Sequence, residues 1–284
     1  MNFKQRLLKE LIFCSLSSGS SGNCYYLGNG FGSILIDAGI SATVTRKFLK
    51  DIGVSIQDIK GVLISHNHTD HIRGLEVLTR KNHLPAYTTV NIWKSIFDRG
   101  INISRDCIRN IQKEERFSLA GFDIEIYPVS HDAPETIGFH ICSGGKSITI
   151  ATDLGYISKT AAGYIKKANL LIIESNYDEQ MLLDGNYPYS LKTRIKSDHG
   201  HLGNHQTSEF LADNISGKLS HICLAHLSKN NNNPQKALQA LKQTFSDKEV
   251  SLKGKYITVL NRNNPSEIID LANQSTLRVS SKSL

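Results

Sequence analysis

The chain has 284 residues, of which 33 are Lys or Arg and 26 are Asp or Glu, so its formal net charge is +7. Hydrophobic residues make up 39% and charged residues 21%, and this ordinary composition excludes an extended disordered chain, a collagen-like repeat and a coiled coil. No apolar run reaches the roughly 18 residues that a membrane-spanning helix needs, and the apolar run at 11–16 is too short for a signal peptide. We therefore expect a cytoplasmic protein with no membrane partner, and the positive charge mildly favours an acidic partner such as nucleic acid.

Short strands dominate the first third of the chain. Segments rich in β-branched and apolar residues, separated by turn-forming residues, predict strands at 11–16, 24–27, 33–37 and 61–65. Ser41 is the predicted N-cap of a helix that continues to about residue 52. Apolar residues that recur every three positions predict a second helix at 70–80, and residues 91–99 form a third predicted helix.

The rest of the chain alternates between strands and helices. Phe122, Ile124 and Ile126 alternate with polar residues, as in a strand with one buried face, and Ser-Gly-Gly at 143–145 indicates a hairpin turn. Further strands are predicted at 137–142, 146–151, 170–173, 220–225 and 256–260, and further helices at 209–214 and 234–245. Two strand-rich parts combined with helices predict the α/β class and a four-layer αβ/βα sandwich.

Domain organisation and cysteine usage are simple. Because the chain has neither a flexible linker nor an internal repeat, we predict a single domain at 1–284 with its core at about 11–260. The tail at 273–284 is polar and lacks periodicity, which predicts a mobile segment. The five cysteines are scattered and contain no C-x-x-C pair, which indicates a reducing compartment and argues against a disulfide framework or a cysteine zinc cluster.

The strongest functional signal is the run HNHTDH at residues 66–71, between a predicted buried strand and a predicted helix. Histidines and carboxylates are common metal ligands in proteins. In an extended loop, residues two apart point to the same side, so His66 and His68 can bind one ion together. Asp70 and His71 lie where the chain turns into the helix and indicate a second metal position nearby. The alternative, a solvated polar loop, does not account for three histidines and one aspartate in six residues.

This run resembles the H-x-H-x-D-H signature of the metallo-β-lactamase superfamily. In that family a histidine, an aspartate and a second histidine follow in order at the ends of later strands, and His131, Asp153 and His226 stand in those places here. The resemblance implies two divalent metal ions, Zn²⁺ or Mn²⁺, between which the sequence does not decide. It also implies that Asp37, after its strand, orients a ligand histidine through a hydrogen bond. The implied ligands are His66, His68 and His131 for one ion and Asp70, His71 and His226 for the other, with Asp153 bridging them.

Loops around the signature narrow the resemblance to the YycJ/VicX/WalJ branch of the superfamily. The segments that carry it are SGSSGN at 18–23, ESN at 174–176, DGNYP at 184–188, SDHGH at 197–201 and AHLS at 225–228. The likeness extends from about residue 11 to 260. There are two departures from the pattern. Thr69 stands where the family often has a smaller residue, and His199 adds a histidine, which leaves open whether it or His201 faces the metals.

The resemblance implies a metal-dependent phosphodiester hydrolase, specifically a DNA exonuclease directed at 5′ ends that uses a dinuclear metal-bound hydroxide. Two divalent ions with two carboxylate ligands attract an anion and can clamp a phosphodiester during in-line displacement. Asp70 is the residue that would also hold the hydroxide. His201, oriented by Glu174, is the candidate general acid, although a histidine bonded only to backbone is an equal reading of the sequence. Candidate substrate-binding residues are Asn176, Lys192, Arg194 and Ser228, and a solvated basic helix face explains Lys192 and Arg194 nearly as well.

Two alternatives stay open at this point. The same metals can hydrolyse a small or cyclic phosphodiester. A protein of another class would be a regulatory nucleic-acid-binding protein with a structural metal site, against which the presence of all seven expected ligands argues. The interval between Asp153 and His226 already holds core elements, so it leaves no room for the extra domain of some related nucleases, and we expect a compact enzyme. The sequence does not indicate an oligomeric state.

Overall fold

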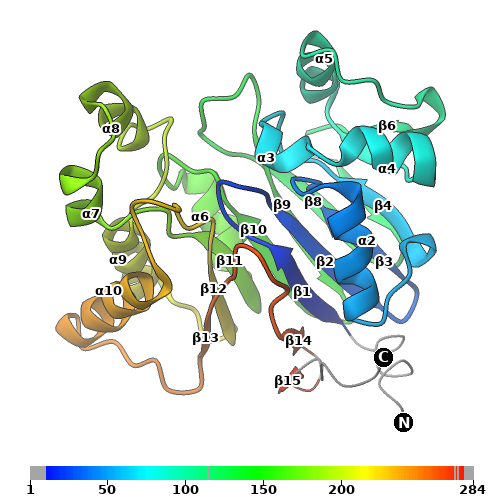
Figure 1. The fold of residues 1–284 in the computed structure, drawn as a ribbon. Helices are drawn as coiled ribbons and strands as arrows, with labels where there is room; N and C mark the ends of the chain where they lie inside the picture. Colours follow the sequence, from blue (N-terminus) through cyan, green and yellow to red (C-terminus); the bar gives the residue numbers. More distant parts are fainter. Residues whose placement is uncertain (1–10, 114, 272, 274, 278–284) are drawn as a thin grey trace. The chain divides into compact units, whose positions relative to one another are not determined.

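The structure is a computed structural model, which describes residues 11–113, 115–271, 273 and 275–277. Its strands form two mixed sheets (Figure 1). One sheet has eight strands in the order β15-β14-β1-β2-β3-β4-β5-β6, and the other has seven in the order β13-β12-β11-β10-β9-β8-β7. None of the helices in these described ranges has the length and hydropathy of a membrane span.

The chain divides into two compact units. The first comprises the described residues of Met1–Ile126, Ile141–Lys146 and Asn261–Leu284, and the second comprises Tyr127–His140 and Ser147–Leu260. No disulfide joins the five cysteines, which all lie within the described ranges; four are buried and Cys142 is half-buried. The prediction of a single domain at 1–284 stays a prediction.

The first unit is built on the eight-stranded sheet. Its strands are β1 (Ile12–Ser17), β2 (Cys24–Asn29), β3 (Gly32–Ile36), β4 (Ile59–Leu63), β5 (Ala86–Thr88), β6 (Ile108–Asn110), β14 (Ile268–Asp270) and β15 (Ser275–Leu277). Strands β1 to β3 are antiparallel, whereas β3 to β6 are parallel, so their carboxyl ends lie at one edge of the sheet. Strand β7 (Arg116–Leu119) pairs antiparallel with β8 (Phe122–Pro128), whose last residues belong to the second unit.

Among the described residues of the first unit, four α-helices accompany these strands. They are α2 (Ala42–Asp51), α3 (Thr69–Ile72), α4 (Leu75–Asn82) and α5 (Val90–Asp98). Ser41 caps α2 as predicted, because its side chain accepts a hydrogen bond from the Val44 N–H. The single helix predicted at 70–80 is wrong, since the structure has two helices there. The N–H of Gly74 donates to the Ala38 carbonyl at 2.7 Å, and a Cβ on Gly74 would lie 2.3 Å from the Ile40 carbonyl oxygen. This close approach ends the first helix.

The second unit contains the parallel strands of the seven-stranded sheet, of which β11 and β12 are buried throughout. Its strands are β10 (Lys146–Ala151), β11 (Leu170–Glu174), β12 (His221–Ala225) and β13 (Tyr256–Val259), and β9 (Ile137–Ser143) is shared with the first unit. Residues Leu170–Ile173 are fully buried, as expected of a strand covered on both faces. Because β10, β11 and β12 are parallel, the residues that follow them lie at one edge of the sheet.

Five helices belong to the second unit. They are α6 (Lys159–Ile165), α7 (Glu179–Asp184), α8 (Tyr189–Ile195), α9 (Asn204–Asn214) and α10 (Pro234–Asp247). Helix α10 packs on α9 and β13 and buries Leu241 and Phe245 in the core of this unit. Helices α6, α7 and α8 were not predicted because each has only six or seven residues, too few for a clear 3.6-residue period.

The C-terminal tail was predicted to be mobile from residue 273. Residues Ser275–Leu277 form strand β15, antiparallel to β14, and the mobility of the tail stays a prediction. Backbone pairing of three residues needs no side-chain periodicity, which is why this short strand could not be predicted from the sequence. Residues 278–284 lie outside the described residues.

Candidate metal centre

The signature histidines of the first unit lie in the short segment between β4 and α4. His66 and His71 are fully buried, and the His66 ring centroid lies 4.7 Å from that of His68 and 4.1 Å from that of His71. The Asp70 carboxylate lies 3.7 Å from His71 Nε2. We call these four residues, His66, His68, Asp70 and His71, the signature set. The structure thus brings the four predicted ligands of this unit together, since ligand atoms of neighbouring members lie within 4.8 Å of one another.

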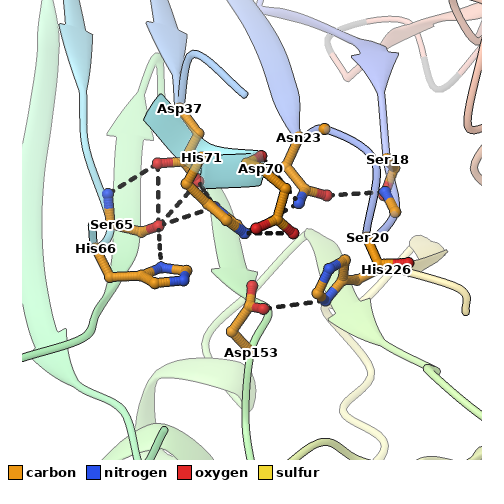
Figure 2. A network of polar contacts seen from close by, with 12 residues as sticks. Ser18, Ser20, Asn23, Asp37, Ser65, His66, Asp70, His71, Asp153 and His226 are labelled. Carbon is orange, nitrogen blue, oxygen red and sulfur yellow. Dashed lines mark hydrogen bonds and ion pairs between the residues drawn. The ribbon is translucent and has the colours of Figure 1, made fainter. Parts of the chain in front are cut away.

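Asp37, which directly follows β3, contacts His71 of the signature set and the neighbouring Ser65 (Figure 2). Its carboxylate lies 2.7 Å from His71 Nδ1, within hydrogen-bond distance of a predicted ligand histidine. Ser65, which sequence reasoning missed, donates its N–H to the same carboxylate at 2.8 Å, and its hydroxyl lies 3.0 Å from His66 Nδ1. Asp37 therefore fixes the orientation of His71 directly and that of His66 through Ser65.

The glycine-rich loop at 18–23 contacts Asp70 and His71 of the signature set through Asn23. The N–H of Asn23 donates to the Asp70 carbonyl at 2.7 Å, and its side-chain amide lies 3.0 Å from His71 Nε2. The Asn23 carbonyl in turn accepts a hydrogen bond from the Gly39 N–H at 2.8 Å. The SGSSGN loop at 18–23 therefore helps to position Asp70 and His71.

Gly39 is the point where this support leaves no room for a side chain. A Cβ at this position would lie 1.7 Å from the Asp70 carbonyl oxygen and 2.5 Å from the Asn23 nitrogen. We expect Gly39→Ala to lower the free energy of unfolding by at least about 3 kcal/mol, the upper end of ordinary overpacking, because two backbone segments must separate. Thermal and urea unfolding measure this change. Gly163→Ala is the matched control, since nothing lies within 4 Å of its Cβ position. Equal stability of the Gly39 variant and the parent would contradict the expectation.

Three further predicted ligands lie in the second unit, and we call His131, Asp153 and His226 the strand-end set. Asp153 follows β10 and His226 follows β12, and the Asp153 carboxylate lies 3.1 Å from His226 Nδ1 (Figure 2) and 3.8 Å from His131 Nε2. All three are buried. His131 Nδ1 lies 3.1 Å from the Gly200 carbonyl, which fixes the ring and directs its other nitrogen toward Asp153.

The backbone at three of these residues has an uncommon conformation. Asp37, Asp153 and His226 have φ values of 58°, 58° and 55°, in the left-handed region. Non-glycine residues seldom adopt this conformation, although Asp and His do so more readily than most, and such residues cluster at functional sites. At each position the chain leaves a strand through a sharp turn and presents a polar side chain at the sheet edge.

Glu174, at the end of β11, joins two histidines of the second unit. Its Oε1 atom lies 2.7 Å from His201 Nδ1 and 3.0 Å from His226 Nδ1, so the predicted contact with His201 is present. Burial alone would raise the pKa of Glu174, but the two histidines hold this pKa well below its usual range. Burial lowers the pKa of His201, and Glu174 more than compensates, so the net pKa is raised. The pKa of His131 is lowered, chiefly by burial.

The second histidine of the SDHGH segment lies elsewhere. His199 is exposed, and its Nδ1 lies 3.3 Å from the Ser130 hydroxyl. His201 instead shares a cluster with Asp153, Glu174 and His226, whose ligand atoms lie within 4.8 Å of one another. Within the second unit, this geometry favours His201 over His199 as the functional histidine.

The four candidate substrate-binding residues have mostly internal contacts. Asn176 and Ser228 are buried, and the Asn176 amide donates to the His226 carbonyl at 2.8 Å. The Lys192 ammonium donates to the Leu183 carbonyl at 2.6 Å, and Arg194 forms an ion pair with Asp132, whose carboxylate also lies 3.3 Å from His131 Nε2. These contacts favour structural roles for Asn176 and Lys192. They also identify Asp132, which sequence reasoning missed, as a link between Arg194 and His131.

Both residue sets have the donor chemistry of a site for divalent metal ions. Each combines imidazole nitrogens with a carboxylate, a combination that suits Zn²⁺ and Mn²⁺ alike. Two of the buried histidines predicted as ligands also have the second contact that usually fixes a metal-binding ring: Asp37 for His71 and the Gly200 carbonyl for His131. The residues of each unit therefore fit a metal-binding function.

Residues 33–222 match a family model described as a beta-lactamase superfamily domain. The chain belongs to the beta-lactamase superfamily. Within the superfamily it is 37% identical over 246 residues to the exodeoxyribonuclease YycJ of Bacillus anthracis. The aligned region covers 84% of this chain and 90% of the relative. It is 36% identical over 221 residues to the exodeoxyribonuclease WalJ of Streptococcus pneumoniae, and this aligned region covers 76% of this chain and 81% of the relative.

A solved structure supports the fold assignment. The metallo-β-lactamase fold protein YhfI from Bacillus subtilis superposes with a TM-score of 0.67 at 17% identity, over 91% of this chain and 99% of that protein. Together these findings confirm the predicted superfamily, its YycJ/WalJ branch and the α/β metallo-β-lactamase-type fold. The metal-binding roles of the signature set and of the strand-end set stay predictions.

Proposed function

We propose that this superfamily member is a metal-dependent exonuclease that removes nucleotides from the 5′ ends of DNA in the cytoplasm. The observation that carries the proposal is the 37% identity over 84% of the chain to a protein named an exodeoxyribonuclease. Support comes from the complete set of seven ligand residues and from the positive net charge of +7, which suits a polyanionic substrate.

The signature and strand-end sets would together hold two divalent ions in this proposal. His66, His68 and His131 would bind one ion, and Asp70, His71 and His226 the other, with Asp153 shared. When bound, a pair of such ions neutralises a phosphodiester and makes water acidic enough to attack it near neutral pH. If both sets serve one centre, His66→Ala and His226→Ala, one from each unit, should each abolish hydrolysis.

The remaining steps belong to side chains of this protein. Asp70 would accept a hydrogen bond from the attacking water and hold it in line with the phosphorus. His201 would donate a proton to the leaving oxygen, and Glu174 would keep the His201 ring oriented and charged. Two observations support this role: the contact of 2.7 Å between His201 Nδ1 and Glu174 and the raised pKa of His201.

Substrate specificity and metal dependence test the proposal directly. We expect stepwise shortening of 3′-labelled duplex DNA, rapid release of a 5′ label as a mononucleotide, and no cleavage of the β-lactam nitrocefin. EDTA should abolish the activity by removing both ions, and Zn²⁺ or Mn²⁺ should restore it; metal analysis should give about two ions per chain. Activity confined to bis-p-nitrophenyl phosphate or cyclic nucleotides would replace the nuclease with a small-molecule phosphodiesterase. Bound metal without any hydrolysis would favour the regulatory alternative.

A further inference from the structure

Helix α5, in the first unit, borders a groove that the proposed chemistry does not use. The groove has a volume of about 360 Å³, lies between α5 and β6, and is lined by residues that include Val90, Trp93, Lys94, Phe97 and Asp98. Val90 and Phe97 are 63% and 43% exposed, a large fraction for apolar side chains on one helix face. The groove therefore offers an unused apolar surface.

An aromatic pair forms the floor of this groove. The rings of Trp93 and Phe97 are stacked, with centroids 5.8 Å apart and planes inclined by 15°. Trp93 is only 3% exposed, and its indole N–H donates to the Arg109 carbonyl on β6 at 3.2 Å. The buried Trp93 thus holds Phe97 in place, so that Phe97 presents a ring to solvent at little further cost in side-chain entropy.

The charge around the groove favours a polyanion. Residues 90–116, from the start of α5 to the first residue of β7, contain six cationic residues and four anionic ones, an excess of two positive charges. Lys94 lines the groove itself, next to Phe97, while Asp98 supplies one opposing charge. An aromatic ring beside cationic side chains is the combination with which proteins bind single-stranded nucleic acid, because bases stack on the ring and cations contact the phosphates.

The groove is connected to the signature set through Arg99, at the end of α5. Its guanidinium donates to the Asn67 carbonyl at 2.8 Å and to the Thr69 hydroxyl at 2.7 Å, both within the run at 66–71. Phe97 is only two residues away from Arg99 along the chain. A nucleotide bound in the groove would therefore be held on the same rigid support as the predicted metal ligands.

We propose that this groove binds an unpaired nucleotide of the DNA substrate, whose base stacks on Phe97 while Lys94 contacts a phosphate. The inference rests on the proposed function, because it assigns the groove to the same substrate. It predicts a preference for DNA ends with a single-stranded overhang over blunt ends, since a paired base is not available to stack.

The single tryptophan of the chain gives a direct measurement, because Trp93 lies in the groove. Wild-type protein in EDTA should change its tryptophan emission when a single-stranded oligonucleotide binds. Anisotropy of a labelled oligonucleotide should show that Phe97→Ala and Phe97→Leu weaken binding roughly 5- to 150-fold, the range found for losing one base–aromatic stack. Phe97→Tyr should keep the affinity, and Lys94→Ala should reduce the salt dependence by about one phosphate contact.

Phe31→Ala is the matched control, since it removes an 82% exposed phenylalanine from another part of the first unit and should leave binding unchanged. Unchanged affinity of Phe97→Ala, or retained affinity of Phe97→Leu, would overturn stacking on Phe97. Self-association of the wild type that Phe97→Ala abolishes would assign the groove to a second copy instead. Because binding is measured in EDTA, these outcomes are independent of the cleavage assay, and absence of nucleotide release from DNA would count against the proposed function alone.

Discussion

Replacing Asp70 with alanine is expected to abolish phosphodiester hydrolysis and to leave the fold intact. In the proposed mechanism this carboxylate both binds a metal ion and positions the attacking water, so its loss removes two functions at once. We expect hydrolysis to fall by at least about 10⁴-fold, the scale seen when one member of a catalytic unit is lost. The backbone contact with Asn23 at 2.7 Å uses the Asp70 carbonyl, which alanine retains. Circular dichroism and thermal unfolding should therefore resemble those of the parent.

The control for this variant is Asp51→Ala, which removes an exposed aspartate of α2 that is paired with Lys47. Such surface pairs contribute little, so activity and stability should both stay near the parent values. Hydrolysis that persists in the Asp70 variant would remove the basis of the mechanism. A variant that loses activity together with its fold would be replaced by Asp70→Asn, which preserves the size of the side chain.

The second large effect is expected from His201→Ala, and it should depend on the leaving group. A general acid contributes about 10²- to 10⁴-fold when the leaving oxygen needs a proton. DNA has such a leaving oxygen, whereas p-nitrophenolate departs without protonation. We therefore expect kcat on DNA to fall within that range while kcat on bis-p-nitrophenyl phosphate changes little. Parallel steady-state measurements on the two substrates provide the comparison.

His199→Ala is the control, because this histidine is exposed two residues earlier and contacts Ser130. It should leave both substrates unaffected. An equal loss on DNA and on the nitrophenyl ester in the His201 variant would show that His201 supports the site without donating a proton. A larger loss in the His199 variant would reverse the assignment of the two histidines.

The signature set and the strand-end residues were accessible from the sequence for different reasons. A cluster of metal-ligand residue types directly after a buried strand indicates metal binding without further information, whereas the strand-end residues followed from the order of ligands in the family that the chain resembles. That Asp37 contacts a predicted ligand histidine followed from the family resemblance, whereas the identity of that histidine, His71, came from the structure. Ser65, Asn23 and Gly39 were not assigned a role, because their contacts depend on how distant loops approach Asp70 and His71.

Other residues show the limits of local pattern. Lys192 and Asn176 have residue types suited to phosphate binding, yet each donates to a backbone carbonyl of its own unit. A residue type indicates which bonds are possible, but only the surrounding fold determines which partner is nearest. The same reason explains the split of the helix predicted at 70–80, since Gly74 bonds to a carbonyl 36 residues earlier in the chain, that of Ala38.

The left-handed backbone conformation of Asp37, Asp153 and His226 lowers the stability of the fold at residues that the proposed activity needs. Each such residue costs about 1–3 kcal/mol relative to a relaxed backbone, and glycine would adopt the same conformation without that cost. In the proposed function these side chains bind a metal ion or orient a ligand, which glycine cannot do, so selection for that function would keep the less stable residue. Selection for thermostability alone would therefore favour glycine at these three strand ends, and such variants would lose the proposed enzymatic activity.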